Sequence, residues 1–510
     1  MKPMIMGIDI GTTGCKTALY RQDGTQVAQS YREYKLMHPE NGWAEESPED
    51  WWLSVVSNAR EVLAFPGIKP EDIAAIGVSC TNGLVAVNKA GDPLLPAVMM
   101  LDQRSAPQAD CIKKQLGEKR VFDITGNRIA PGAFYAPTML WIAQERPDIY
   151  KQTYKFLVPT GFIVQHLTGQ FTIDVSRASV TMLLDIRKRA WSEELLKAMD
   201  IDRNKLPQLY ESSEVVGRVT AEAAETTGLK AGTPVIAGCV DTVSAAIGAG
   251  AVKQGQTFGL LGTVGRVCVV TDGTRFDGRM MNFCHGQEDL WLTNAAINAA
   301  GATLRWFRDT FYQYEAAVAK EQDESVYDIM MDEASQADLG GNGLIYLPYL
   351  SGERSPLWNG DAKGIIYGLT LAHKRSQIIR ALLEGVAYAV RHNLEIIRDE
   401  YNVSFNNMTL SNGGARSRLW CRIIGDVTKT NISIPKVLDT EVLGVALLAG
   451  VGVGIYSNLA QAVNETVQIA RIIPYDAQKA ERYDRYFQAY LELVNDMSGR
   501  FSQISSLLKV

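Results

Sequence analysis

Two short glycine-threonine segments constrain this sequence more than any other feature. The first follows an apolar run that ends at Asp9, and a second apolar run comes after it. It contains Gly11, Thr12, Thr13 and Gly14. This pattern predicts a strand, a tight turn and another strand. Glycines permit positive φ and can bring several backbone N–H groups to one concave side, where they would bind phosphate oxygens.

The side chains around this turn also suit a phosphate. The two threonine hydroxyls are further donors, and Lys16 supplies a positive charge. Asp9 lies where the first strand ends. It could hold Mg²⁺ through the water shell of the ion, because Mg²⁺ keeps most of its waters and takes one or two carboxylates. For this segment alone, a surface hairpin without a ligand is an equally good interpretation.

A second copy of the pattern favours the ligand. About half a chain length later, an apolar run leads into Gly262 and Thr263, and another apolar run follows. We therefore predict two domains, residues 1–247 and residues 248–510, each with a phosphate-binding hairpin. Two such turns facing a common cleft would hold a nucleotide from both sides.

Length and composition exclude several classes of protein. A chain of 510 residues is too long for one core and predicts two large domains. The net charge is −6 and the basic residues are scattered, which argues against a nucleic-acid partner. The sequence has neither an apolar run of membrane-spanning length nor a signal-peptide pattern, so we expect no membrane partner and a cytoplasmic location. Seven single cysteines and five dispersed histidines predict free thiols and no metal-ligand cluster.

Other polar residues follow predicted strands. Thr81 and Asn82 end a buried strand over 73–83, and strand ends are where α/β proteins place ligands. The next apolar runs, 84–88 and 96–101, are expected to continue the same sheet. Asp102 comes directly after them, at another polar strand end.

Three further segments complete the pattern. Arg104 either contributes to the substrate site or forms an ion pair that braces the strand end. Asp241 follows another strand and precedes a helix of small residues, so it either caps that helix or faces the cleft. Ser47 is expected to cap a helix that starts at Pro48, and residues 376–393 form a long amphipathic helix.

With these segments in order, the sequence resembles the FGGY carbohydrate kinases. The resemblance covers essentially the whole chain, through motifs that include GIDIGTTGCK, AGCVDTVSAAIGAG, LLGTVG and SNGGARSRLW. It implies an α/β fold with two actin-like ATPase (ribonuclease H-like) domains. Each domain would hold a mixed five-stranded sheet flanked by helices, with ATP and Mg²⁺ in a central cleft.

The resemblance also implies roles for individual residues. Asp241 would be the catalytic base, would contact the sugar and, together with Asp9, would hold Mg²⁺ through water. An ionised carboxylate can accept the proton of a sugar hydroxyl during phosphoryl transfer. The positions that would bind the nucleotide are Gly11, Thr12, Thr13, Lys16, Gly262, Thr263, Gly301, Gly414 and Arg418.

The sugar side departs from the family pattern. Thr81-Asn82 stands where xylulokinases have Met-His and glycerol kinase has Arg-Glu. Thr138 replaces a usual lysine, and Thr160-Gly161 replaces a usual Lys-Asp pair. Asp102 and Arg104 have a spacing similar to an Asp…Arg pair of xylulokinases, which implies that Asp102 accepts a hydrogen bond from a sugar hydroxyl. The overall similarity favours a small-molecule sugar substrate, a pentulose such as D-xylulose, with gluconate or another ketose or polyol as the alternative.

A different class of function also fits the predicted fold. An actin-like or chaperone-like switch would use the state of ATP to control a partner. The position of Asp241, where an acceptor base is needed, favours the kinase. The sequence leaves the oligomeric state open between a monomer and a homodimer.

Overall fold

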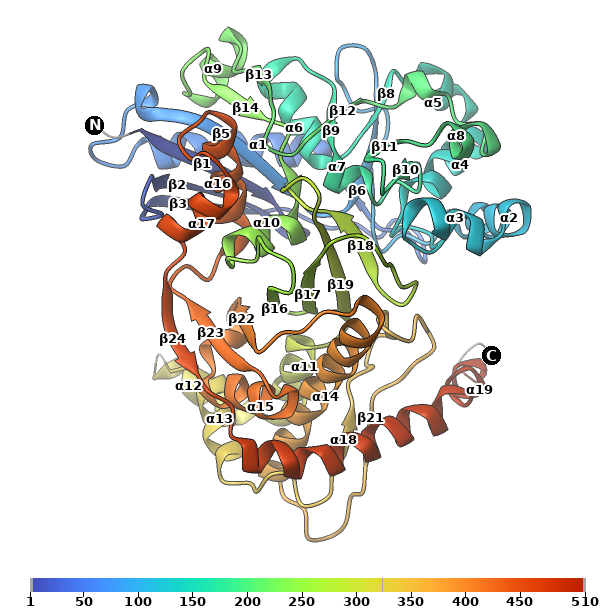
Figure 1. The fold of residues 1–510 in the computed structure, drawn as a ribbon, viewed down its shortest axis with the longest axis vertical. Helices are drawn as coiled ribbons and strands as arrows, with labels where there is room; N and C mark the ends of the chain where they lie inside the picture. Colours follow the sequence, from blue (N-terminus) through green and yellow to red (C-terminus); the bar gives the residue numbers. More distant parts are fainter. Residues whose placement is uncertain (1–2, 323, 508–510) are drawn as a thin grey trace. The chain divides into compact units, whose positions relative to one another are not determined.

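Two compact units make up the chain, and each is assembled from three separate segments (Figure 1). The structure, a computed structural model, describes residues 3–322 and 324–507. The segments of unit 1 are Met1–Lys253, Asp272–Leu292 and Asp439–Val467. Those of unit 2 are Gln254–Thr271, Thr293–Leu438 and Gln468–Val510. The units therefore interleave along the sequence, and the domain boundary after residue 247 stays a prediction.

Unit 1 is organised around a seven-stranded mixed sheet. Its strands are β1 (Met4–Ile10), β2 (Gly14–Arg21), β3 (Gln26–Glu33), β5 (Ile73–Cys80), β13 (Val215–Arg218), β14 (Pro234–Ile236) and β15 (Cys239–Val240). The order is β13-β14-β5-β1-β2-β3, and β15 pairs with the end of β5. β1 is antiparallel to β2 and parallel to β5. The sheet is mixed, as predicted, and it has seven strands where five were expected.

Unit 1 also contains short strands, which form further small sheets except for β18, which pairs with β19 (Trp291–Ile297). They are β4 (Glu45–Glu46), β6 (Gly83–Val87), β7 (Ala97–Met99), β8 (Lys155–Leu157), β9 (Thr172–Asp174), β10 (Leu184–Asp185), β11 (Ala190–Trp191), β12 (Gln208–Tyr210) and β18 (Met281–Cys284). The expectation that 84–88 and 96–101 continue the main sheet is wrong. β6 and β7 pair with each other in a sheet of order β4-β7-β6-β8, because the chain turns away from the main sheet directly after β5.

Helices cover the sheets of unit 1. They are η1 (Pro70–Asp72), η2 (Arg203–Lys205), α1 (Pro48–Leu63), α2 (Ala106–Leu116), α3 (Glu118–Thr125), α4 (Tyr135–Glu145), α5 (Pro147–Gln152), α6 (Pro159–Thr168), α7 (Val175–Ala178), α8 (Glu193–Ala198), α9 (Ala221–Thr227), α10 (Asp241–Gly248), α16 (Thr440–Gly452) and α17 (Leu459–Thr466). The predicted start of α1 is confirmed. The Ser47 side chain accepts a hydrogen bond from the Asp50 backbone N–H at 3.3 Å, and Pro48 is the first helical residue.

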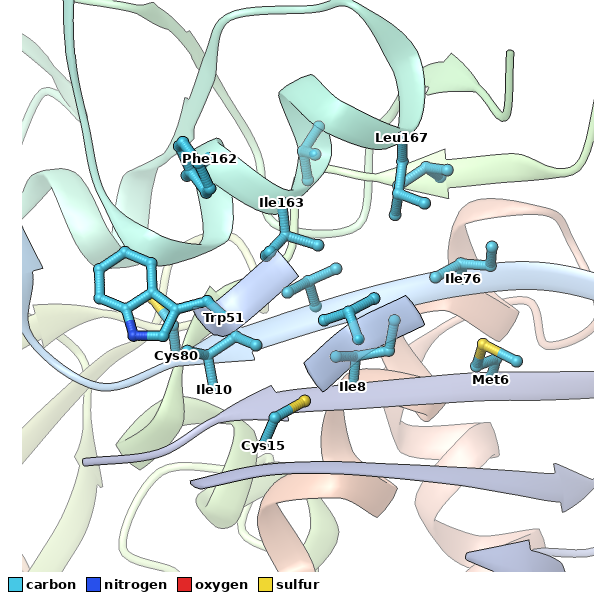
Figure 2. Packing of buried hydrophobic residues seen from close by; sticks show 14 of the residues in the cluster. Met6, Ile8, Ile10, Cys15, Trp51, Ile76, Cys80, Phe162, Ile163 and Leu167 are labelled. Atoms are coloured by element: carbon cyan, nitrogen blue, oxygen red, sulfur yellow. The ribbon is translucent and has the colours of Figure 1, made fainter. Parts of the chain in front are cut away.

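The core of unit 1 lies between its main sheet and the helices α1 and α6. Figure 2 shows Phe162, Ile163 and Leu167 of α6 on the side of the sheet that carries Ile8 and Ile76. These side chains are fully buried, and their burial is the main favourable contribution to the stability of the unit. The sheet holds the ends of β1 and β5 side by side, and both strands end in candidate site residues.

The helix α16 packs on β1 and β5, although it comes from a much later part of the chain (Figure 1). Two strand glycines allow this close contact. A Cβ atom added at Gly7 would collide with the carbonyl oxygen of Val442, and one added at Gly77 would collide with that of Val445. The strand glycines therefore let α16 lie tightly on the sheet, whereas Gly444 of α16 faces α10, where an added Cβ would collide with the Ser244 carbonyl oxygen.

Unit 2 repeats the plan of unit 1. Its strands are β16 (Thr257–Leu261), β17 (Gly265–Thr271), β19 (Trp291–Ile297), β20 (Ile345–Leu347), β21 (Ile365–Tyr367), β22 (Asn407–Ser411), β23 (Asn431–Pro435) and β24 (Ile469–Ile473). The main sheet follows the order β19-β17-β16-β22-β23-β24. β16 is antiparallel to β17 and parallel to β22, as β1 is to β2 and β5.

The helices of unit 2 include the long amphipathic one that the sequence predicts. They are α11 (Gly301–Phe311), α12 (Gln313–Glu321), α13 (Val326–Ser335), α14 (Arg375–Tyr401), η3 (Gly413–Arg416), α15 (Arg418–Thr428), α18 (Ala477–Ser498) and α19 (Phe501–Ser506). α14 confirms the helix expected over 376–393 and extends beyond it. Among the residues described, no helix has the length and apolar character needed to cross a membrane.

Candidate active site

The first glycine-threonine segment forms the tight turn between β1 and β2. Ile10 pairs with Cys15, and the Gly11 N–H donates to the Gly14 carbonyl at 3.0 Å. The Gly11 N–H is therefore used within the turn. The Thr12 hydroxyl lies 3.1 Å from the Thr81 hydroxyl, which links the turn to the end of β5. The structure thus brings two of the predicted site segments together.

Asp9 is surrounded by groups that disfavour its charge. Burial raises the pKa of its carboxyl to about 7, and the nearby charges of Glu441 and Asp241 add to this effect. A hydrogen bond of 2.7 Å from Ser79 Oγ and the charge of Lys16 act in the opposite direction. Mutually repelling carboxylates suit a divalent cation, and Mg²⁺ held through water needs few direct protein ligands.

Glu441 was not predicted as a site residue. It lies in the first turn of α16, which the sequence marks only as rich in glycine and alanine. The sequence signal that could have identified Glu441 is an acidic residue at the start of a helix that is otherwise small and apolar. Among the residues described, no group of three or more His, Cys, Asp or Glu side chains is arranged to bind a metal directly.

Lys16 is engaged by a carboxylate in this structure. Its ammonium group lies 2.6 Å from Asp439 Oδ1, and Gln29 donates to the other oxygen of Asp439 at 3.3 Å. The two charged side chains are about a quarter and a third exposed, so water screens the pair only partly. A phosphate contact of Lys16 would therefore either use the ammonium donors that Asp439 leaves free or replace Asp439 as the partner.

Asp241 is the first residue of α10, and the N-cap position belongs to Val240. Its Oδ1 accepts hydrogen bonds from the Thr242 N–H at 2.6 Å and from the Thr242 hydroxyl at 2.9 Å. The preceding strand β15 runs parallel to β5, with Val240 paired to Cys80. Asp241 and Thr81 thus follow neighbouring strand ends, at the same edge of the sheet.

Asn82 is fixed by two partners at this edge. Its Nδ2 donates to the Ala133 carbonyl at 2.8 Å, and its Oδ1 accepts from Arg177 at 3.1 Å. Arg177 is fully buried on α7 and also donates to the Cys80 carbonyl. Sequence reasoning did not identify Arg177, because a single arginine in a polar segment resembles a surface residue.

Asp102 and Arg104 form a buried ion pair. Arg104 donates to Asp102 Oδ1 at 2.9 Å and to Oδ2 at 2.7 Å, and its guanidinium also lies 2.8 Å from Glu45. The Ala44 N–H donates to Asp102 Oδ2 at 2.7 Å, and the Trp43 ring lies 3.6 Å from the guanidinium carbon. The bracing ion pair is the alternative that the structure confirms, and a sugar contact of Asp102 stays a prediction.

The other residues that differ from the family pattern, Thr138, Thr160 and Gly161, are buried. The Thr138 hydroxyl lies 3.4 Å from that of Ser105, and the Thr160 hydroxyl donates to Cys80 Sγ at 2.7 Å. A Cβ added at Gly161 would lie 2.5 Å from the Thr172 carbonyl oxygen, closer than real Cβ atoms approach such an atom. Packing therefore explains why no larger residue stands at position 161.

In unit 2, the second glycine-threonine turn joins β16 to β17. Leu261 pairs with Gly265 across the turn. The Gly262 carbonyl accepts from the Gly301 N–H at 2.9 Å, and the Thr263 carbonyl accepts from the Ala302 N–H at 3.1 Å. The turn thus satisfies two of the N–H groups that the start of α11 would otherwise leave unpaired.

A cavity of about 630 Å³ opens beside this second turn. Its lining includes the predicted nucleotide-binding residues Gly262, Thr263, Gly301 and Gly414. The other lining residues are Leu261, Leu304, Arg305, Ser325, Tyr327, Asp328, Met331, Gly413, Arg416, Ser417 and Trp420. Arg418, which was also predicted, begins α15 and does not belong to this lining. The volume suits a ligand of nucleotide size.

Comparisons with known proteins agree over the whole chain. Residues 4–248 match the profile of the FGGY family of carbohydrate kinases, N-terminal domain, and residues 260–453 match its C-terminal domain. The chain is 30% identical over 508 residues to a xylulose kinase of Bacillus subtilis, covering 99% of each sequence. It is 28% identical over 506 residues to a gluconokinase of the same organism, covering 99% of this chain and 98% of the other.

A solved structure supports the fold as well. The xylulose kinase from Rhodospirillum rubrum superposes with a TM-score of 0.88 at 27% sequence identity. The match covers 98% of this chain and 100% of the other. This likeness confirms the predicted α/β fold class.

Proposed function

Because the chain belongs to the FGGY family of carbohydrate kinases, and is therefore a sugar kinase that uses ATP, we propose that its substrate is a neutral pentulose such as D-xylulose. The family assignment decides against the actin-like or chaperone-like switch. The resemblance to a xylulose kinase over nearly the full length supports the pentulose. A gluconokinase of similar coverage makes gluconate the second candidate.

The choice of a neutral sugar rests on the partners of three basic side chains near the strand ends of unit 1. Lys16 is paired with Asp439, and Arg104 is paired with Asp102 and Glu45. Arg177 is buried and donates to the carbonyl of Cys80 and the amide of Asn82. A substrate carboxylate would need a cationic partner. Each of these three cations already has at least one partner, which favours a sugar without a carboxylate, although the buried Arg177 Nε has none among the residues described.

We assign the role of catalytic base to Asp241. Phosphoryl transfer passes through a loose transition state, so positioning and charge neutralisation are the main contributions of the protein. The Asp241 carboxylate would accept the proton of the attacking sugar hydroxyl as the bond to the phosphoryl group forms. The Thr242 hydrogen bonds orient the carboxylate for this step.

Asp9 and Asp241 would hold Mg²⁺ through water. The raised pKa of Asp9, caused by burial and by neighbouring negative charge, is the feature of unit 1 that fits a divalent cation. When bound, Mg²⁺ neutralises charge on the phosphate oxygens. The cavity of unit 2 would hold the nucleotide, with Gly262 and Thr263 at its phosphate side.

A coupled assay of ADP release tests this proposal. Purified protein with MgATP would be assayed against a panel of ketoses, polyols and sugar acids, with kcat/KM measured for each. We expect D-xylulose or a related pentulose to give the highest value, and gluconate to give a value at least tenfold lower. A preference for gluconate would refute the neutral-sugar proposal while leaving the kinase assignment intact.

A further inference from the structure

The four-residue helix α7 makes polar contacts with both strand ends that carry predicted site residues. Its Arg177 contacts the end of β5, which Asn82 follows. Its Ser176 contacts β15, where the Ser176 hydroxyl accepts a hydrogen bond of 3.0 Å from the Val240 N–H, directly before Asp241. A single turn of the chain therefore links the predicted sugar side of this sheet edge to the proposed base.

The Arg177 guanidinium fixes the orientation of the Asn82 side chain. Its Nη1 donates to Asn82 Oδ1 at 3.1 Å, and its Nη2 donates to the Cys80 carbonyl. Asn82 Nδ2 donates in turn to the Ala133 carbonyl at 2.8 Å. An amide has one accepting oxygen and one donating NH₂ group, so these partners determine which way round it lies. The second lone pair of Oδ1 and the second N–H of Nδ2 then point in defined directions and remain for a substrate hydroxyl.

Stability alone does not account for an arginine at this place. Arg177 is 1% exposed, and within the described part of the chain its Nε has no hydrogen-bond partner. A buried charge and an unused buried donor both cost free energy, and well-packed apolar residues of similar volume are often at least as stabilising. The presence of Arg177 therefore indicates a need for the particular donors that it directs at Asn82 and Cys80.

Ser176 fixes the second strand end. Its hydroxyl donates to Asp174 Oδ2, which also accepts from the Ser176 backbone N–H at 2.8 Å. The carboxylate thus orients the hydroxyl, and the hydroxyl oxygen is left to accept from the Val240 N–H. Because Val240 is the N-cap residue of α10, this bond holds the start of the helix whose first residue is Asp241.

We propose that α7 is a positioning element of the kinase reaction, in which Arg177 orients the Asn82 amide for the sugar and Ser176 holds the start of α10 for the base. This inference rests on the proposed function and on the predicted contact between Asn82 and the sugar. Both residues act through others and do not touch the reacting atoms. Phosphoryl transfer depends mainly on positioning and charge neutralisation, so small displacements of the acceptor or the base lower its rate.

Steady-state kinetics of the full chain, with MgATP and the sugar that wild type turns over best, test the role of Arg177. We expect Arg177→Met to raise the KM for the sugar about ten- to a hundredfold and to leave the KM for ATP within about twofold of wild type, because a charge-assisted hydrogen bond to the amide is lost. Arg177→Lys should recover part of the loss, because it keeps the charge with fewer donors. Arg187→Met is the matched control, since the exposed Arg187 also donates to a backbone carbonyl, that of Asp123 at 3.0 Å, and it should change neither KM.

A double-mutant cycle separates positioning from a general loosening of the fold. In an Asn82→Ala background, Arg177→Met should change the KM for the sugar by less than about threefold, because the residue through which Arg177 acts is already absent. A purely structural arginine would instead cause its full loss in both backgrounds. The thermal unfolding midpoint of each variant shows whether the fold is intact, and Arg177→Lys takes the place of Arg177→Met in the cycle if the latter unfolds.

Ser176→Ala tests the other strand end. It leaves the Val240 N–H without its partner, so we expect kcat to fall about five- to fiftyfold while the KM for the sugar stays within about threefold of wild type. Ser192→Ala is the matched control. The Ser192 hydroxyl likewise accepts from a backbone N–H, that of Leu195 at 3.3 Å in α8, and its loss should leave kcat unchanged.

Four results would overturn the inference. The first three are an unchanged KM for the sugar in Arg177→Met, equal rises in the KM for sugar and for ATP, and additive effects of Arg177→Met and Asn82→Ala. The fourth is an unchanged kcat in Ser176→Ala. The sugar panel on the wild-type protein identifies the substrate independently, so a failure of the pentulose proposal is distinguishable from a failure of the role of α7.

Discussion

The two glycine-threonine hairpins share a backbone plan but differ in the groups that surround them. In unit 1, the position two residues before the first glycine holds Asp9, and in unit 2 it holds the buried Leu260. The first hairpin is accompanied by Glu441 and Asp241, whose charges act on Asp9. The second hairpin lies beside a cavity whose lining includes Arg305, Arg416 and Asp328, and Arg305 donates to the Thr263 hydroxyl.

This difference shows how a repeated backbone element can take separate roles. A turn of small residues supplies neutral donors wherever it occurs, and the neighbouring elements decide the local charge. Acidic surroundings suit a metal ion and a proton acceptor, whereas a cationic cavity suits phosphate. We infer that unit 1 contributes the chemistry and unit 2 the nucleotide affinity. Four experiments test this assignment of separate roles to the two units.

Loss of the proposed base should give the largest effect. Asp241→Asn is expected to lower kcat for the sugar about a hundred- to ten-thousandfold, because the amide cannot accept the hydroxyl proton. ADP affinity should stay within about twofold of wild type if unit 2 binds the nucleotide. Asp332→Asn, on the exposed side of α13, serves as the control. Retention of full sugar-dependent turnover in Asp241→Asn would contradict the role of Asp241 as the base and the assignment of the chemistry to unit 1.

The strand glycines of the two hairpins should differ in their tolerance to a side chain. Gly7→Ala places a methyl group against the carbonyl of Val442, a backbone atom, and should cost on the order of 1–3 kcal/mol in the free energy of unfolding. In β16, a Cβ at Gly259 would lie 2.7 Å from Leu410 Cδ2, the end of a flexible side chain. Gly259→Ala should therefore cost less.

Urea denaturation of both variants measures this difference. Gly360→Ala is the control, because a Cβ at Gly360 meets no atom within 4 Å. Equal losses in Gly7→Ala and Gly259→Ala would show that α16 can shift away from β1 more easily than its packing indicates.

The acidic character of the first hairpin predicts a pH effect. The pKa of Asp9 in the folded chain is raised to about 7 from an ordinary value of 3.8, so the folded state binds more protons than the unfolded state between these two values. The contribution of Asp9 to stability is therefore full below about pH 4 and is lost as the pH rises toward 7.

Chemical denaturation of wild type and Asp9→Asn between pH 5 and pH 8, without Mg²⁺, tests this sign. The stability of wild type relative to Asp9→Asn should fall as the pH rises, by on the order of 1–2 kcal/mol. MgATP should reduce the fall, because a cation favours the charged carboxylate. A stability difference that is independent of pH would contradict the assigned environment of Asp9.

The smallest expected effect concerns the ion pair of the first hairpin. If Lys16 leaves Asp439 to contact phosphate, Asp439→Asn removes a competitor and should lower the KM for ATP by up to about fivefold. Asp123→Asn, which removes the partner of Lys119 in another ion pair of unit 1, should leave KM unchanged. A higher KM in Asp439→Asn would instead show that the pair positions Lys16 for the nucleotide.

The sequence predicts those features that depend on local chemistry. Both hairpins, the Ser47 cap and the strand end before Asp241 follow from spacing and residue type alone. The pairing of β6 with β7 was missed, because an apolar run does not show which neighbour it pairs with. Glu441 and Asp439 were missed for a related reason, since only the folded chain brings α16 to β1. Arg177 was missed because its burial and its partners are properties of the structure.

The late position of α16 in the chain has a consequence for biosynthesis. The sheet surface at Gly7 and Gly77 emerges early from the ribosome, but the helix that covers it is made only after the intervening unit 2 segment. At translation rates of about 5 to 20 residues per second, the roughly 360 residues between Gly77 and α16 take on the order of twenty to seventy seconds. During that time the nascent chain lacks the helix that covers this face of the sheet in the folded unit.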